Sequence, residues 1–417
     1  MTSKALENAA PTAPAAPRRL ALWLVLLAAG GTFALTMGTR QTMGLFLSPL
    51  NTATGLGLGR ISLAFAFGQL WWGLTQPFAG AVADRIGTGR VIFLGALLVA
   101  LGTFITPYMT TTAGLILAIG VLSAGGAGMA GPSVLMAATT RLIAPERRGM
   151  ATGIVNAGGS FGQFLMAPLA GALVAGLGWA PALQVMGLLA LLALPAVWVL
   201  RGNARQAAPA GHKAVGTREA IGTALRTPSF LLLGAGFMVC GFHVAFLATH
   251  LPGVIASCGL PTQVAGWALG MIGLFNIAGS LAMGWAVGRW RMKSLLALLY
   301  AARALAVLAF VLAPKTEAVV LVFSAVMGVT FLSTVPPTVG LVAKFFGTAH
   351  MATLFGIVML AHQVGGFMGA WLGGKAFELT GAYDAVWYLD IVLAVGAALV
   401  NLPIREARPL RAATARP

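Results

Sequence analysis

Twelve apolar runs, each long enough to cross a membrane, constrain this chain more than any other feature of its sequence. An α-helix of about 20 apolar residues spans the ~30 Å hydrocarbon core of a bilayer. Of the 417 residues, 59% are hydrophobic and only 8% are charged, whereas a soluble domain carries about 25% charged residues. We therefore expect an all-α membrane protein with spans at 20–48, 61–83, 91–109, 113–140, 149–176, 179–200, 228–257, 263–288, 294–312, 317–343, 350–374 and 384–402.

The basic residues predict how these spans are oriented. The formal net charge is +17, but the charges are scattered among short loops, so they do not indicate nucleic-acid binding. Most of the 26 Lys and Arg residues fall on one side of the predicted membrane. Only Arg60, Lys315 and Lys375 fall on the other side, and Arg40 and Arg303 lie within spans. Loops rich in Lys and Arg remain in the cytoplasm.

The sequence divides into two similar halves. The predicted N-terminal six-helix bundle covers 20–200 and the C-terminal one covers 228–402, with a basic linker at 201–227. The tails at 1–19 and 403–417 and the linker are predicted to be cytoplasmic. No cleavage site follows the first apolar run, so we expect it to be retained. Duplicated halves of this kind place a substrate site near the membrane midplane between them.

A charged motif follows the second predicted span. It reads Gly80-x-x-x-Asp84-Arg85-x-Gly87-x-x-Arg90. With twelve spans and a central linker, the chain resembles the major facilitator superfamily over essentially its whole length. The resemblance implies two pseudo-symmetric bundles, no enzymatic activity, and a monomer in the bacterial inner (plasma) membrane.

The same resemblance implies a cytoplasmic gate. Asp84, Arg85 and the other residues of the motif would latch one conformational state, and Arg147 and Arg148 before the fifth span resemble a second latch. The alternative is that the charged residues of the motif form a solvated loop.

Arg40 is a fixed charge within the first apolar run, which continues to Leu50. Ionisable groups inside membrane spans usually face the bundle interior and mark a substrate or ion path, so Arg40 suggests an anionic cargo. The alternative is that its side chain snorkels to the outer interface. Around Arg40 the chain is most similar to monocarboxylate porters and their oxalate/formate-antiporter relatives, and the porters have a functional lysine at this position.

Two further positions bear on that resemblance. His362 falls where the oxalate carriers have a substrate-binding lysine. Asn276 and Ser280 stand where monocarboxylate porters have an aspartate and an arginine. Because both residues are uncharged here, the usual proton-coupling carboxylate is in doubt, and a monoanion is favoured over a dianion.

Arg303 and Asp390 are charged residues in the middle of predicted spans nine and twelve. A buried charge is costly unless it is paired, so one hypothesis is a structural ion pair between them. The alternative is that they bind substrate or carry a proton.

Neutral and titratable polar groups complete the candidate site. Histidine titrates near neutrality and can carry a proton, so His243, His250 and His362 are candidate substrate or proton ligands, although each is equally compatible with a satisfied buried histidine. Asn276, Ser280, Tyr300 and Gln363 are candidate cavity-lining residues, or they form hydrogen bonds between helices.

We therefore predict a secondary transporter that moves a small organic anion, best a monocarboxylate, by alternating access. The lipid bilayer is its other partner, and protons are a candidate coupling ion. No phosphate-binding loop, metal motif or cofactor is expected. Two alternatives stay open: an exporter of hydrophobic or cationic compounds, and a membrane receptor that does not transport.

Overall fold

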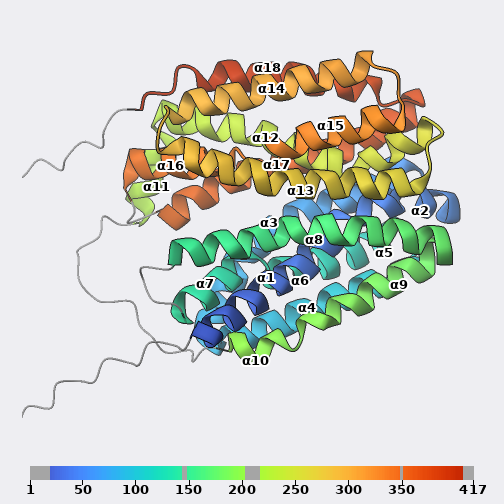
Figure 1. Ribbon diagram of the computed structural model, residues 1–417, viewed down its shortest axis with the longest axis horizontal. Coiled ribbons are helices and arrows are strands. Elements are labelled where there is room, and N and C mark those ends of the chain that lie inside the picture. The colour runs from blue at the N-terminus through green and yellow to red at the C-terminus, as the bar shows by residue number, and fades with distance from the viewer. Residues whose placement is uncertain (1–18, 143–147, 202–216, 348–350, 407–417) are drawn as a thin grey trace, which may run out of the picture.

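The computed structural model describes residues 19–142, 148–201, 217–347 and 351–406. The helices of the N-terminal half form the lower bundle in Figure 1. They are α1 (Arg19–Gln41), α2 (Leu47–Thr54), α3 (Leu58–Ile86), α4 (Thr88–Ile105), α5 (Thr112–Leu115), α6 (Gly125–Met129), α7 (Pro132–Leu142), α8 (Arg148–Leu177), α9 (Trp179–Ala190) and α10 (Ala196–Leu200), with short 3-10 or π segments η1 (Met43–Phe46), η2 (Thr106–Tyr108), η3 (Ile116–Ala124) and η5 (Leu191–Ala193).

The helices of the C-terminal half form the upper bundle (Figure 1). They are α11 (Thr217–Leu225), α12 (Pro228–Ser257), α13 (Thr262–Val287), α14 (Met292–Leu312), α15 (Glu317–Thr330), α16 (Val335–Phe346), α17 (Met351–Thr380) and α18 (Asp384–Asn401). The short helix α11 lies inside the segment 201–227 that the sequence presents as a linker, so part of that segment is helical.

Eleven helical segments among the described residues are long and apolar enough to cross a membrane. The remaining predicted span, 61–83, is the 29-residue helix α3, which is more polar because it carries Gln69, Gln76 and Asp84. At about 1.5 Å per residue its length is also sufficient to cross a bilayer. The protein therefore has the all-α membrane fold in two bundles that the sequence predicts.

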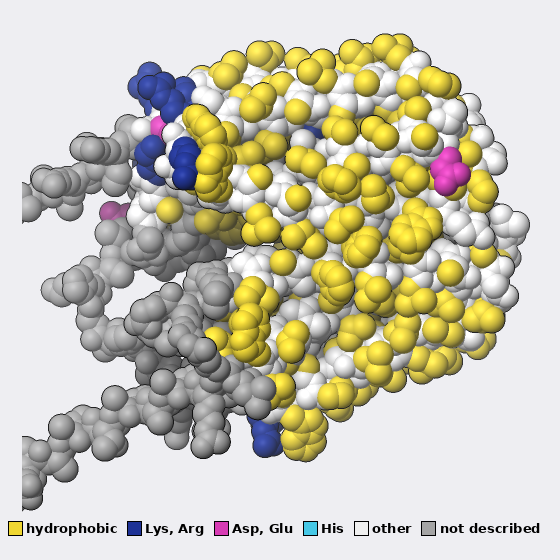
Figure 2. All heavy atoms as spheres, in the orientation of Figure 1, with side chains coloured by type: hydrophobic (Ala, Val, Ile, Leu, Met, Phe, Trp, Pro, Cys, Tyr) yellow, Lys and Arg dark blue, Asp and Glu magenta, His cyan; other side chains and the backbone are white. Residues whose placement is uncertain are grey.

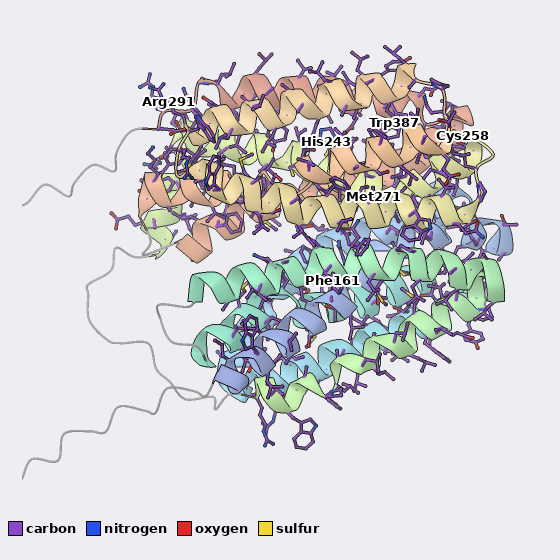
Figure 3. All side chains as sticks on the ribbon, viewed as in Figure 1. Phe161, His243, Cys258, Met271, Arg291 and Trp387 are labelled. Carbon is purple, nitrogen blue, oxygen red and sulfur yellow. The ribbon has the colours of Figure 1, made fainter. Side chains whose placement is uncertain are left out.

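The two ends of the molecule differ in charge. We call the end that holds the start of α1, helix α11 and the end of α18 the linker end, and the opposite end, near α2, the far end (Figure 1). Lys and Arg side chains gather at the linker end in Figure 2, and Arg291 is labelled there in Figure 3, with Cys258 at the far end.

Two helix pairs join the bundles: α3 packs on α17, and α8 packs on α13. On the far side they approach closely. A Cβ atom placed on Gly266 of α13 would lie 2.8 Å from the carbonyl oxygen of Ala167 in α8, and one on Gly374 of α17 would collide with Ser62 in α3. The largest apolar core cluster also crosses between the bundles here, because it joins Met43 and Phe46 to α12.

Toward the linker end the same helix faces are unopposed. Gly80, Gly153, Gly284 and Gly356 lie one or a few turns further along the four interface helices, and none has a described heavy atom within 4 Å of its Cβ position. Residues seven or eleven apart share a helix face, so these glycines continue the faces that pack tightly on the far side. The bundles are therefore closed at the far end and separated toward the linker end.

Candidate functional site

Arg40 lies in the last turn of α1, at the point where the helix gives way to the 3-10 segment η1. The negative end of the helix dipole stabilises a cation in this position. The backbone runs close to α12 here, since a Cβ atom on Gly44 would collide with the carbonyl oxygen of Ala248. Arg40 is partly buried inside the protein rather than exposed at a surface.

The partners of Arg40 are neutral. Its guanidinium donates to Oε1 of Gln69 in α3 and, over 3.3 Å, to Oε1 of Gln41. The guanidinium carbon also lies 4.6 Å from the centre of the Trp72 ring. None of the ion pairs between described residues involves Arg40. The positive charge is therefore solvated by amide oxygens and an aromatic face, without a counter-charge from these residues.

Arg40 also sets the direction of a hydrogen-bond chain between the bundles. A guanidinium can only donate, so Gln69 presents its oxygen to Arg40 and its amide nitrogen to Gln363 of α17, whose Oε1 accepts over 3.2 Å. This leaves Nε2 of Gln363 as a buried donor without a described partner, and Nε1 of Trp72 is another. The hydrogen-bond chain therefore ends in the Nε2 donor of Gln363, and Trp72, whose ring lies against Arg40, has a second donor without a described partner. N–H donors of this kind suit an anion.

The hydrogen-bond chain from Arg40 to Gln363 lies between the closed and the open parts of the molecule. Gln363 packs against Gly73 of α3. One turn further toward the linker end, Met359 of α17 still packs against the N-terminal cluster that holds Trp72, and two turns further Gly80 and Gly356 are unopposed. Toward the far end, a cavity of only about 40 Å³ adjoins Arg40 and Gln69, room for about one water molecule. Arg40 thus stands where the closed side of the molecule meets the open side.

A larger groove of about 460 Å³ lies further toward the far end, between α2 and the ends of α12 and α13. It is lined mainly by small and apolar residues such as Pro49, Pro252 and Ala265, with Ser48 and Thr52 as hydroxyl groups. None of its lining residues is charged, so it offers no anchor for an ion.

Arg303 and Asp390 do not form the ion pair that the sequence suggests as one hypothesis. The Arg303 guanidinium donates to the carbonyl oxygens of Thr330 and Phe331 and to the Thr330 hydroxyl. These carbonyls lie at the C-terminus of α15, where the last carbonyl groups of a helix lack intrahelical donors. Arg303 therefore caps a helix end. The consecutive prolines Pro336 and Pro337 mark the break between α15 and α16 in the sequence, but the sequence does not tell which side chain reaches the carbonyl groups there.

Asp390 instead contacts His243. The Nδ1 atom of His243 on α12 forms an ion pair with Oδ1 of Asp390 on α18, and the exposed fractions of the two side chains are 1% and 0%. Figure 3 shows His243 in the interior of the upper bundle. The pair lies within the C-terminal half and makes no contact with Arg40.

The other two histidines also lie away from Arg40. Nε2 of His250 lies 2.6 Å from the carbonyl oxygen of Ala370, which ties α12 to α17. His362 is buried on α17, with its ring 4.8 Å from that of Phe237, and it borders Cys240. His362 thus points into the C-terminal bundle. The next residue, Gln363, points toward the N-terminal bundle, where it contacts Gly73 and Gln69.

Asn276, Ser280 and Tyr300 hold helices together. Asn276 donates to Ser160 of α8 over 2.8 Å and accepts from the backbone of Leu332 and from Ser280. Tyr300 donates to the carbonyl oxygen of Gly236 over 2.7 Å. Their polar groups are thus occupied by contacts between helices, of which the bond from Asn276 to Ser160 joins the two bundles.

The predicted gate is only partly described. Arg85 and Arg90 are exposed at the linker end, and Gly87, with a φ of 95°, forms the turn between α3 and α4. Gly80 faces open space. The side chains of Asp84 and Arg148, and all of Arg147, lie outside the described residues.

Sequence reasoning missed two features. Gln69 is not among the predicted site residues, although a glutamine in a membrane span is itself a signal for a buried polar partner. Cys240 was not considered a site residue; its thiol lies 3.1 Å from the Thr334 hydroxyl, near Arg303 and His362.

Comparisons with known proteins agree with this architecture. The family model of the Major Facilitator Superfamily matches residues 22–370. Monocarboxylate transporter 13 of Rattus norvegicus is 26% identical over 389 residues, covering 91% of this chain and 89% of that protein. The MFS-type transporter YcxA of Bacillus subtilis (strain 168) is 24% identical over 394 residues, covering 91% and 94%.

A solved structure shares the fold. It is a bacterial homolog to the human lysosomal transporter Spinster, in an inward-facing and unoccupied conformation. Its TM-score is 0.76 at 16% sequence identity, with 92% of this chain and 97% of that chain covered.

Proposed function

Because the chain belongs to the Major Facilitator Superfamily, we propose that it is a secondary transporter of a small organic anion, with a monocarboxylate as the best candidate. The observation that carries this proposal is Arg40, a partly buried cation with neutral described partners, placed where the open side of the molecule meets the closed side. Relatives that are named monocarboxylate transporters support the choice of substrate class.

In the proposed transport cycle, the carboxylate binds the Arg40 guanidinium from the linker side. It can accept further hydrogen bonds from Nε2 of Gln363 and Nε1 of Trp72, which have no described partner. Charge-assisted hydrogen bonds of this kind are roughly twice as strong as neutral ones. Since Gln363 belongs to the other bundle, the anion contacts both halves at once.

Alternating access then follows from the two ends of the molecule. The described state is open toward the linker end, which we assign to the cytoplasm of a bacterial inner membrane from its basic residues (Figure 2). Release on the far side requires the glycine contacts between α8 and α13 and between α3 and α17 to separate. The Gln69–Gln363 hydrogen bond must also break.

Export of a cationic compound is less well supported. Such an exporter needs a carboxylate that its cargo can reach, and Asp390 is fully buried against His243. The positive charge of Arg40 would also repel a cation at the meeting point of the bundles.

The proposal is tested by uptake of radiolabelled monocarboxylates, beginning with lactate and benzoate, into proteoliposomes. We expect Arg40→Ala to lose at least about tenfold in uptake, because a hydrogen bond to a charged group contributes about 1.5–3 kcal/mol. Arg40→Lys should retain part of the uptake, because it keeps the charge and loses the planar, two-pronged geometry.

Arg60→Ala is the matched control, because Arg60 is exposed at the start of α3. It should transport like the wild type. Undiminished anion uptake by Arg40→Ala would contradict the proposal.

A further inference from the structure

The burial of His243 and Asp390 against each other costs free energy, because both are polar groups removed from water. Both side chains are almost completely buried. Apart from their mutual contact, neither the imidazole nor the carboxylate has a hydrogen-bond partner among the described residues. A buried carboxylate with so few partners is strongly destabilised in its charged form. Replacing a buried ion pair by apolar residues is often neutral or stabilising, so packing alone does not explain why the pair is present.

Arg303, the fixed cation of this half, forms no ion pair with Asp390. Arg303 uses its guanidinium for the carbonyl oxygens at the end of α15. The net charge of the pair therefore depends on its own protons. A neutral His243 beside an ionised Asp390 has a net charge of −1. One added proton makes the pair neutral, whether that proton lies on the imidazole or on the carboxyl group. Without that proton the pair has a charge of −1, which an interior of this kind tolerates poorly.

Other titratable groups surround the pair from the helices packed against it. Cys240 and His250 lie on α12, Tyr300 and Arg303 lie on α14, and His362 lies on α17. The described residues of α13 include no titratable group. The other charged residues on these helices and on α18 lie near the helix ends. Asp390 is thus the carboxylate of this interior, and Arg303 is its fixed cation.

We propose that the His243–Asp390 pair is the proton-binding site of the transporter, so that the anion on Arg40 and one proton on this pair move together. The inference rests on the proposed anion transport. In this proposal the pair holds its proton while both side chains are buried. The proton is released to water when α12 and α18 move enough to expose the pair, which returns it to a charge of −1.

A structural link connects this site to Arg40. Helices α12 and α17 approach so closely that a Cβ atom on Gly241 would overlap the carbonyl oxygen of His362. The next residue, Gln363, ends the hydrogen-bond chain from Arg40. A shift of α17 on anion binding therefore acts directly on α12, two residues from His243.

The test compares concentrative uptake with exchange in proteoliposomes of the full chain, using radiolabelled lactate and subtracting the uptake of protein-free liposomes, because the neutral acid form of a monocarboxylate also crosses lipid and follows a pH gradient without a transporter. A gradient of one pH unit supports accumulation of about tenfold when one proton moves with each anion. We expect the wild type to approach that ratio. Asp390→Asn should lose accumulation, with an inside-to-outside ratio of about one, and should still exchange internal for external anion without a pH gradient.

Controls separate coupling from folding. Asp384→Asn removes an exposed carboxylate at the start of the same helix and should accumulate like the wild type. If Asp390→Asn does not fold, the paired variant His243→Gln/Asp390→Asn keeps a neutral contact that can form a hydrogen bond. That variant should give the same loss of accumulation with retained exchange.

The outcomes distinguish the two proposals. Full pH-driven accumulation by Asp390→Asn or by the paired variant would overturn the proton site and leave anion transport standing. Equal loss of accumulation and exchange, in protein that melts like the wild type, would also overturn it, because the pair would then act in transport itself. Intact uptake by Arg40→Ala would instead overturn the proposed function.

Discussion

At the scale of single residues, the two guanidinium groups inside the bundles are solvated in different ways. Arg303 donates to the carbonyl oxygens that end α15, so its charge completes a helix terminus. Arg40 has an amide oxygen on each side and the Trp72 ring below it, and free donors lie next to it. Arg303 thus has two backbone carbonyl partners and lies deep in the C-terminal bundle, although its Nη1 has no described partner. Arg40 has neutral side-chain partners and lies between the bundles.

A negative charge introduced at Gln69 tests this difference. Gln69→Glu places a carboxylate of nearly the same shape against Arg40 and supplies the missing counter-charge. A new buried ion pair would then compete with the substrate, and we expect the apparent affinity for lactate or benzoate to fall at least about tenfold. The measurement is the KM for uptake. Gln184→Glu, at an exposed position bonded to Tyr108, is the control and should leave KM unchanged.

The partners of these charges were less predictable than the charges themselves. Arg40, Arg303 and Asp390 stand out in the sequence because charged residues are rare in apolar runs. Their partners depend on how distant helices rotate and pack. The ion-pair hypothesis for Arg303 and Asp390 was wrong because Arg303 reaches the carbonyl groups at the break after α15, and this depends on how α14 and α15 pack. The role of Gln363 was open in the sequence and is clearer once Gln69 lies beside it.

At the scale of helices, small residues determine how closely the elements pack. Glycines within membrane helices let neighbouring helices approach closely. In the structure, Gly158 lies against Gly30 of α1 and Gly365 against Met238 of α12. The spans themselves were predictable from hydropathy, because lipid demands long apolar helices. Helix α11 was not predicted, because its polar sequence gives no membrane signal.

Helix α12 provides a matched pair of glycines for a stability prediction. Gly241→Ala would place a methyl group against the carbonyl oxygen of His362, and Gly234→Ala would place one in open space. Overpacking of this kind costs about 1–3 kcal/mol, so the melting temperature of Gly241→Ala in detergent should fall. Gly234→Ala should melt at the same temperature or higher, since alanine favours a helix. Equal melting of both variants would argue against the tight α12–α17 contact.

At the scale of the whole molecule, the two bundles meet along one half of their length. The far side is closed by contacts such as Ser62 with Gly374, and the linker side has the unopposed glycines Gly153 and Gly356. Arg40 lies at the boundary. The described state therefore leaves the proposed anion site facing the linker side, as one state of the alternating access that we propose would require.

Cysteine accessibility tests this asymmetry. In a Cys258→Ser background, Gly356→Cys should react with a membrane-impermeant maleimide added to inside-out vesicles, because its face is open. Ser62→Cys, fully buried on the far side, should resist the reagent from either side in this state. Labelling of Ser62→Cys from the outside, with Gly356→Cys protected, would show that the resting protein opens at the opposite end. The native Cys240 is buried and should contribute no background.

The recognition of negative charge by Arg40 is tested most directly by comparing a carboxylate with its amide. The measurement is equilibrium binding of lactate and of lactamide, which has a similar shape and no charge, to purified wild type and to Arg40→Gln. We predict that the wild type binds lactate at least about tenfold more tightly than lactamide, and that Arg40→Gln loses this preference. A preference for lactate that survives in Arg40→Gln would contradict the assignment of Arg40 as the anion site.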